Sequence, residues 1–237
     1  MDPAVRDVKR RTLRKKLGLA YGPYKVERQA VGHVRKSGTV RRILSRKDQP
    51  VKLHIASGEN YKEGWVNIDL HPITKKDVLH DLSKGIPFPD NSVDFIYNEH
   101  FIEHLSYKDG FAFMNEAYRV LKPGGVMRIA CPDLTFWIEG YAKDNWRSQE
   151  WVGLINAHWY PNRCFMLNQH MREDGGHKYI YDYEGLSTRL NEAGFFSHHD
   201  IQRFCARIQR DNLIAGLNDN RIFLAMLGQI ELVAQRL

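Results

Sequence analysis

Several polar side chains in the first half of the chain stand where short apolar runs end, and their types suit the binding of an adenosine. Asp69 lies near the end of one run, and its carboxylate can accept two hydrogen bonds from the vicinal hydroxyls of a ribose. Asp81 can accept a hydrogen bond from an exocyclic amine, while Leu82 supplies an apolar wall beside a purine. Asn98 and His100 follow a further run. The sequence therefore predicts a nucleoside pocket whose residues come from separate elements.

The runs that carry these side chains predict a parallel β-sheet. Each is short, rich in β-branched residues and bounded by Gly, Pro, Asp or Asn, which is typical of buried strands. Ligands bind beyond the carboxyl ends of such strands, so the polar residues fall where a ligand would lie. Gly58, after the first run, would let the backbone approach that ligand closely. The five predicted strands comprise residues 51–56, 65–70, 77–82, 93–97 and 126–130.

The connection between the first two predicted strands is short. Parallel strands usually need a dozen or more residues to connect them, often as a helix. The eight residues from Ser57 to Gly64 can hold at most one helical turn. The spacing alone would also permit an antiparallel hairpin.

Helical periodicity and turn residues predict the elements that follow. Ser106 and Asp109 fit a capping box, and apolar residues then recur at helical spacing to about Leu121, with a stop at Pro123 and Gly124. We expect further helices over residues 134–143 and 183–193, and the last two strands at residues 195–196 and 221–233.

The order of these motifs resembles a known family. The residues read IASG at 55–58, NIDL at 67–70, PFPDNSVD at 87–94 and VLKPGG at 120–125. This series resembles class I S-adenosylmethionine-dependent methyltransferases, and within them small bacterial proteins with a type 11-like domain. The resemblance spans about residues 51–135 and extends more loosely to the end of the chain.

The resemblance implies an α/β, Rossmann-like, doubly wound fold. Its sheet would be mostly parallel and seven-stranded, with an antiparallel C-terminal strand and a truncated first crossover helix. The implied cofactor is S-adenosyl-L-methionine, held at the carboxyl ends of the strands. The residues that we expect to bind it are Ala56, Ser57, Gly58, Asp69, Asp81, Leu82 and Asn98.

Two residues depart from the family's first-strand motif, which usually reads LDLGCG. His54 stands where the family has an acidic or amide residue that helps to hold the methionine ammonium. Ala56 stands where the family has its first glycine. The motif therefore supports the fold more strongly than it supports cofactor affinity.

The implied chemistry is an in-line displacement at a sulfonium methyl group, in which positioning the nucleophile supplies most of the rate. A hydroxyl acceptor is also helped by a general base, and the ordinary pKa of histidine suits that role. We expect His100, opposite the methyl group, to be this base and His104 to support it, with a purely structural role as the alternative for each. The expected reaction is oxygen methylation, more than nitrogen methylation, of a small or glycan-like acceptor.

Three other functions fit parts of the sequence. A non-catalytic member of the fold, which binds a cofactor or a partner, is favoured by His54 and Ala56. Residues His100 to His104 spell HxxEH, a zinc-peptidase pattern with Glu103 as base, but they follow a strand within the methyltransferase-like series, and we expect no metal ligand. Methylation of RNA through the basic N-terminal segment is the third.

The N-terminal segment, residues 1–48, is strongly basic. It carries 15 Lys or Arg against 4 Asp or Glu, whereas the other 189 residues carry 20 against 24. Such an arm could make weak contact with RNA or an anionic membrane. It has few aromatic residues that could stack on bases, which favours a solvated extension whose few apolar residues dock on the domain.

These features divide the chain into a basic arm at residues 1–48 and a methyltransferase-like domain at residues 49–237. Within the domain, residues 144–182 are rich in Trp, Tyr and His, as expected of a lid that selects the substrate. Three cysteines without a CxxC pair indicate a reducing, cytoplasmic compartment. No apolar run is long enough for a membrane span, so any membrane contact would be peripheral. The oligomeric state is not predicted.

Overall fold

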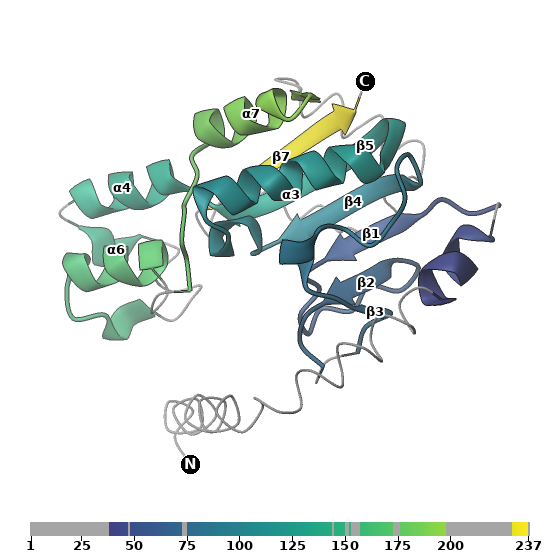
Figure 1. Cartoon of the computed structure of the whole chain (residues 1–237). Coiled ribbons are helices and arrows are strands. Elements are labelled where there is room, and N and C mark those ends of the chain that lie inside the picture. Colours follow the sequence, from purple (N-terminus) through teal and green to yellow (C-terminus); the bar gives the residue numbers. More distant parts are fainter. Residues whose placement is uncertain are drawn as a thin grey trace, which may run out of the picture.

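One seven-stranded sheet organises the protein, and Figure 1 shows its strands side by side, with helix α3 (Tyr107–Val120) lying across the middle of the sheet. The structure is a computed structural model. It describes residues 38–46, 48–72, 75–143, 145–149, 152, 157–172, 176–197 and 229–236.

The strands lie in the order β3-β2-β1-β4-β5-β7-β6. All neighbours are parallel except that β7 is antiparallel to β5 and β6. The predicted Rossmann-like, mostly parallel sheet with an antiparallel C-terminal strand is therefore confirmed. The order reverses between β1 and β4, so their carboxyl ends form the switch point at which such sheets bind ligands. The strands are β1 Lys52–Ile55, β2 Val66–Asp69, β3 Val78–Leu79, β4 Val93–Glu99, β5 Leu121–Pro132, β6 Phe195–Ser197 and β7 Gln229–Arg236.

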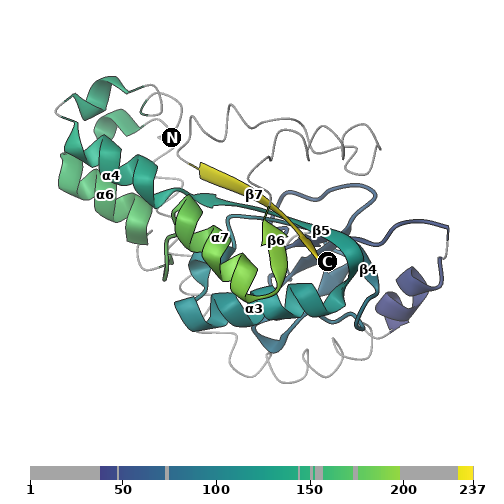
Figure 2. The same ribbon diagram turned by 90° about the horizontal axis from the view of Figure 1, so that it is seen from above.

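Helices α3 and α7 cover one face of the sheet, as Figure 2 shows, and bury the main core there. Among the described residues we find no helix that packs on the opposite face, so the doubly wound layering expected from the sequence is not seen in this part of the chain. Helices α4 and α6 pack against each other beyond the carboxyl end of β5. The helices are α3 Tyr107–Val120, α4 Leu134–Ala142, α6 Arg163–Arg172 and α7 Tyr183–Glu192, with 3-10 turns η1 Leu82–Lys84, η2 Ile102–His104, η3 Trp146–Ser148 and η4 Ala157–Trp159.

The crossover from β1 to β2 contains no helix. Residues 56–65 form turns, yet Leu53 pairs in parallel with Val66. Parallel pairing decides against the hairpin that the spacing permitted, and it agrees with the truncated crossover helix implied by the resemblance.

The fully buried side chain of Asn67 forms hydrogen bonds with backbone N–H and C=O groups of this crossover. Its Oδ1 accepts from the backbone N–H of Lys62 at 2.9 Å, and its Nδ2 donates to the carbonyl oxygens of Lys62 at 2.9 Å and Trp65 at 3.0 Å. A helix would satisfy such groups internally. The side-chain amide of Asn67 therefore supplies hydrogen bonds to the crossover backbone that a helix would otherwise form internally.

Strand β5 starts earlier than predicted. Val93 of β4 pairs with Leu121 of β5, and Phe95 pairs with Val126. The register between the two strands therefore shifts at this point, and the Lys-Pro-Gly-Gly turn of β5 accounts for the extra residues. Gly124 has φ +81°, which its lack of a Cβ permits. At the other end of the chain, the described part of the predicted strand 221–233 begins at Gln229, and residues 221–228 lie outside the described residues.

Most of the basic arm, residues 1–37, lies outside the described residues, so its predicted contacts with RNA or a membrane stay predictions. Residues 38–44 are helical, and Val40 is buried in the main core with Ile43 and Leu44 packed against it. A domain boundary at residue 48 stays a prediction. In the described part of the chain, no helix combines the length and the apolar character that crossing a membrane requires.

The predicted capping box of α3 is present and leads to a first prediction. The N–H of Asp109 donates to Ser106 Oγ at 3.1 Å, and Ser106 Oγ donates to Asp109 Oδ2 at 2.7 Å. Ser106→Ala should lower the free energy of unfolding by about 1 kcal/mol, because it leaves a helix N–H without its cap. Urea unfolding measures the change. Ser106→Thr, which keeps the hydroxyl, should lose less, and equal stability of the Ala variant and the wild type would contradict the role of the cap.

Candidate functional site

The loops after β1 and β2 are joined by a hydrogen bond from Gly58 to Asp69. The backbone N–H of Gly58 donates to Asp69 Oδ2 at 2.8 Å, and the N–H of His71 donates to Asp69 Oδ1 at 2.7 Å. The Asp69 side chain is 6% exposed. Since each carboxylate oxygen has two lone pairs, both can still accept from a ligand hydroxyl. Asp69 thus lies where it was expected and fixes the shape of the first loop.

The backbone after β1 is left-handed at two positions. Ala56 has φ +53° and Gly58 has φ +52°. An L-residue in this region is strained by roughly 1–2 kcal/mol, so Ala56 takes a conformation that would suit glycine better. No described atom lies within 4 Å of the place where a Cβ on Gly58 would stand. The loop therefore keeps a glycine-like path and open space beside Gly58.

Two buried polar side chains at this edge lack partners among the described residues. Asn98 is fully buried in β4, and neither its Nδ2 nor its Oδ1 has a hydrogen-bond partner there. Ser57 is 3% exposed, and its Oγ is likewise without a partner in the described part of the chain. Orphaned buried polar atoms are costly, because burial removes the water that would satisfy them. These atoms are the kind that a bound ligand or water satisfies.

Asp81 and Leu82 take part in local structure beyond β3. Asp81 caps η1, and its Oδ1 accepts from the N–H of Ser83 at 3.1 Å and from Ser83 Oγ at 2.7 Å. The hydrogen bond from Ser83 lowers the pKa of Asp81, although partial burial acts in the opposite direction. The expected contact of Asp81 with an exocyclic amine stays a prediction.

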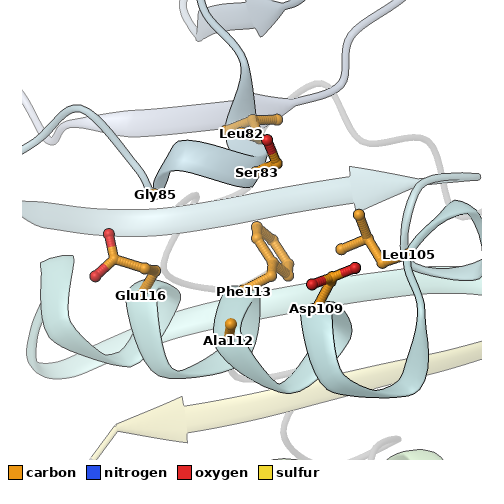
Figure 3. A pocket seen from close by; sticks show the side chains of 8 residues that line it. All are labelled: Leu82, Ser83, Gly85, Leu105, Asp109, Ala112, Phe113 and Glu116. Atoms are coloured by element: carbon orange, nitrogen blue, oxygen red, sulfur yellow. The ribbon is translucent and has the colours of Figure 1, made fainter.

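Leu82 packs against the main core and also lines a hollow between η1 and α3. In Figure 3, side chains of α3 rise on one side of this hollow and the η1 residues lie on the other. Among the predicted site residues, Leu82 is the one that lines it, so this hollow is separate from the Gly58–Asp69 loops. It is lined by Leu82, Ser83, Gly85, Leu105, Asp109, Ala112, Phe113 and Glu116.

His54 lies on the sheet face opposite α3, in a row of polar and aromatic side chains. It pairs across the strands with Asn67 and Tyr97, and Tyr97 pairs with Arg128. His54 Nδ1 donates to Asn67 Oδ1 at 2.9 Å, and its ring stacks on Tyr97 with 5.3 Å between centroids. Lys62 Nζ lies 5.1 Å from the centroid of the same tyrosine. A buried imidazole thus occupies the position where the resemblance implies an acidic or amide residue.

Burial lowers the pKa of His54 below its ordinary value, and the hydrogen bond to Asn67 acts in the opposite direction. Among the nearby charges, Lys62 also lowers this pKa, whereas Glu99 and Asp69 raise it. His54 is therefore neutral at pH 7 and adds no positive charge to the site.

His100 follows β4 and is held in a strained backbone conformation. Its φ is +51°, and its N–H donates to the carbonyl oxygen of Ala130 at 3.0 Å. Its Nδ1 lies 3.1 Å from Glu103 Oε1. The Glu103 side chain is 1% exposed, whereas that of His100 is 49% exposed. A buried carboxylate therefore orients an accessible imidazole at the switch point.

His104 lies beside His177, which comes from the segment after α6. The ring centroids of the two histidines are 5.0 Å apart. His104 Nδ1 donates to the carbonyl oxygen of Gly176 at 3.1 Å, and His177 Nδ1 donates to that of His170 at 2.8 Å. The sequence placed His177 only within the predicted lid and did not reveal that it reaches His104. No motif spacing connects the two positions.

The predicted lid, residues 144–182, has a small core of its own in its described part. Trp146, Val152, Tyr160 and Met166 pack with one another and with Trp137 of α4, which precedes the predicted lid. Trp159, on η4, is 66% exposed. A role in selecting a substrate stays a prediction.

Comparison with known proteins identifies a relationship in the central segment. Residues 53–129 match the family model described as "Methyltransferase domain". A probable S-adenosylmethionine-dependent methyltransferase of Mycolicibacterium smegmatis is 38% identical over 80 residues, which are 33% of this chain and 30% of that protein. Demethylmenaquinone methyltransferase of Listeria monocytogenes is 30% identical over 82 residues, which are 32% of this chain and 33% of that protein. The matched part thus spans about a third of the length of these curated relatives.

Solved structures of low sequence identity also resemble the chain. A methyltransferase from Archaeoglobus fulgidus matches with a TM-score of 0.45 and 16% identity, over 91% of this chain and all of that one. One from Mesorhizobium loti matches with a TM-score of 0.47 and 13% identity, over 85% of this chain and 98% of that one.

The environment of His54 predicts a pH dependence of stability. Because its pKa is lower in the folded protein than the ordinary 6.5, the unfolded chain binds more protons between these two values. The contribution of neutral His54 to the free energy of unfolding should therefore be fully present above about pH 6.5. It should be lost as the pH drops through this window, by at most about 1.4 kcal/mol per pH unit.

His54→Asn keeps a donor toward Asn67 but cannot titrate, so its stability should depend less on pH. Urea unfolding of both proteins at about pH 7.5 and about pH 5.5 gives the difference, and the other histidines are common to both proteins. Parallel pH profiles of the wild type and the variant would show that His54 does not carry this effect.

Proposed function

We propose that this chain, whose residues 53–129 belong to a class I S-adenosylmethionine-dependent methyltransferase domain, transfers the methyl group of S-adenosyl-L-methionine to a hydroxyl of a small or glycan-like acceptor. The observation that carries the proposal is the joined pair of loops after β1 and β2, beside the switch point, where Gly58 donates to buried Asp69. Fold alone would not decide between activities, so the site has to support the chemistry.

The residues after the strands fit the cofactor. Asp69 has acceptor capacity for ribose hydroxyls, and open space lies beside Gly58. The orphaned atoms of Ser57 and Asn98 are candidates to hydrogen bond with the ligand. When bound, S-adenosyl-L-methionine supplies a methyl group on a sulfonium that is ready for displacement. The protein's part is to hold this group and the acceptor in line.

His100 and Glu103 form the proposed base. Since a carboxylate can only accept, the Nδ1 of His100 donates to Glu103 Oε1, and the neutral ring then carries its lone pair on Nε2. An acceptor hydroxyl that donates to this nitrogen would lose its proton to it as the oxygen attacks. The buried Glu103 would stabilise the imidazolium that results, as in other oriented histidine bases.

The acceptor class is supported by exposed apolar side chains on η4, within the predicted lid, and on α4, which precedes it. Trp159, Ile138 and Tyr141 present partly exposed apolar side chains on η4 and α4, and α4 begins directly after β5. Large exposed apolar side chains are a feature of surfaces that bind ligands. A small or glycan-like molecule could pack against such side chains.

A non-catalytic member of the fold is the second candidate, favoured by His54 and Ala56. Two observations weigh against it. Ala56 adopts φ +53°, so the loop follows a glycine-like path despite the substitution. His54 is neutral, so it does not repel the methionine ammonium. Absence of cofactor binding by the folded protein would favour this second candidate.

Asp69→Asn tests the cofactor site. The substitution removes the negative charge and one acceptor oxygen, so the affinity for S-adenosyl-L-methionine should fall by roughly tenfold or more, the equivalent of a charge-assisted hydrogen bond. Isothermal titration calorimetry measures it. Glu63→Gln, at an exposed residue paired with Lys75, removes the same charge elsewhere and should bind as the wild type does. If the two variants bound S-adenosyl-L-methionine with equal affinity, Asp69 would not be part of the cofactor site.

His100→Gln tests the base. Turnover, followed as release of S-adenosylhomocysteine with an acceptor found by screening sugars and small alcohols, should fall about 10²–10⁴-fold. Cofactor affinity should change little, because the effect lies in the transition state. Glu63→Gln, at an exposed residue paired with Lys75 and away from η4 and α4, is the control. Equal losses in turnover and affinity would assign His100 to binding.

A further inference from the structure

We infer that Glu103, His104 and His177 form a binding site for a divalent transition metal ion such as Zn²⁺. Each residue offers one ligand atom, and the three atoms lie within 4.8 Å of one another. Two imidazoles and one carboxylate are a donor set that suits first-row transition metals better than Mg²⁺ or Ca²⁺, which prefer oxygen ligands. The inference does not rest on methyl transfer, and it departs from the sequence-based expectation of no metal ligand.

The buried carboxylate of Glu103 would be stabilised by a bound cation. Its side chain is 1% exposed, and its Oε1 accepts from His100. Its Oε2 is buried and has no hydrogen-bond partner among the described residues. A buried carboxylate oxygen without compensation is costly, and a coordinated cation would compensate it.

The two histidines are in the tautomer that a metal requires. A backbone carbonyl can only accept, so the Nδ1 of His104 donates to Gly176 and the Nδ1 of His177 donates to His170. In the neutral ring the lone pair then lies on Nε2. Metal-binding histidines commonly donate their other N–H to a carbonyl or carboxylate, which fixes the ring and raises the basicity of the ligand nitrogen. Both rings already have this support.

The backbone holds the ligand segments together without an ion. The carbonyl oxygen of Glu103 accepts from the N–H of Lys178 at 2.8 Å and from that of Tyr179 at 3.2 Å. A metal at about 2.1 Å from each ligand would bring tetrahedral ligand atoms to about 3.4 Å, so closure needs movements on the order of 1 Å. Three protein ligands would leave a fourth position for water.

This site differs from the HxxEH zinc-peptidase pattern. That pattern needs both histidines on one helix face, with the glutamate as base. Here residues 102–104 form the 3-10 turn η2, His100 precedes it with φ +51°, and Glu103 is itself a ligand. His177 replaces His100 as the second imidazole. The ion would link the lid segment to the turn after β4 and would not form a peptidase centre.

The test is Zn²⁺ binding by the full chain. Chelator-treated protein is titrated with Zn²⁺ in competition with a chromophoric indicator. We expect one equivalent to bind, and His177→Ala to weaken this binding by about 100-fold or more, since losing a ligand should cost at least as much as losing a supporting residue. His158→Ala, an exposed histidine on η4, should bind as the wild type does. Zn²⁺ should also raise the midpoint of thermal unfolding of the wild type but not of His177→Ala.

Two results would overturn the inference. The first is that the wild-type protein takes up less than about half an equivalent of Zn²⁺, a result that can be interpreted without any variant. The other is equal affinity of His177→Ala and His158→Ala, because the ion would then lie elsewhere. A Glu103→Gln variant gives independent support if its affinity also falls, since the amide removes the anionic ligand while keeping the size of the side chain.

Discussion

The short connection between β1 and β2 depends on the buried side chain of Asn67. Its amide satisfies Lys62 and Trp65, and it also donates to Asp77 Oδ2 at 3.1 Å and accepts from His54. Through these bonds a turn takes the place of a crossover helix without leaving buried backbone groups unpaired. The same amide fixes the tautomer of His54, because Asn67 Oδ1 accepts from Nδ1. The parallel pairing of the first two strands, and therefore the position of Asp69, follows from this arrangement.

Two residues with a strained backbone lie at the switch point. Ala56 and His100 both have positive φ, and they follow the two strands that flank it, whereas Asn91, which also has positive φ, lies in the turn before β4. Strained non-glycine residues persist where the surrounding structure determines them, and they are frequent at functional sites. Here the strain directs the β1 loop toward Asp69 and places His100 over Glu103. The two carboxylate oxygens of Glu103 have different partners. Oε1 accepts from His100, and Oε2, which is buried and has no partner among the described residues, is the proposed ligand of a cation.

The sequence predicted those features that depend on local pattern. Apolar runs located the strands, and Ser106 located the start of α3. It did not predict the role of Asn67, since a polar residue inside a strand run shows neither its direction nor its partners. It also missed the pairing of His104 with His177, because contacts between distant segments follow from packing and not from spacing. The resemblance to the family predicted the seven-stranded sheet with its antiparallel C-terminal strand, whereas helices on both faces of the sheet stay a prediction, because the described residues show them on one face. Cofactor contacts of Asp81 and Asn98 could be expected from the family, but no local pattern determines where these two side chains point.

The proposed activity requires a nucleoside cofactor to bind at the loops joined by Gly58 and Asp69. The most direct measurement is the amide spectrum of ¹⁵N-labelled protein during titration with S-adenosylhomocysteine, with the Gly58 resonance assigned. This resonance should shift, because its N–H donates to the carboxylate that would receive the ribose. The resonances of residues that line the hollow between η1 and α3 should change less. An unchanged Gly58 resonance at saturating ligand, or shifts confined to that hollow, would contradict binding at these loops.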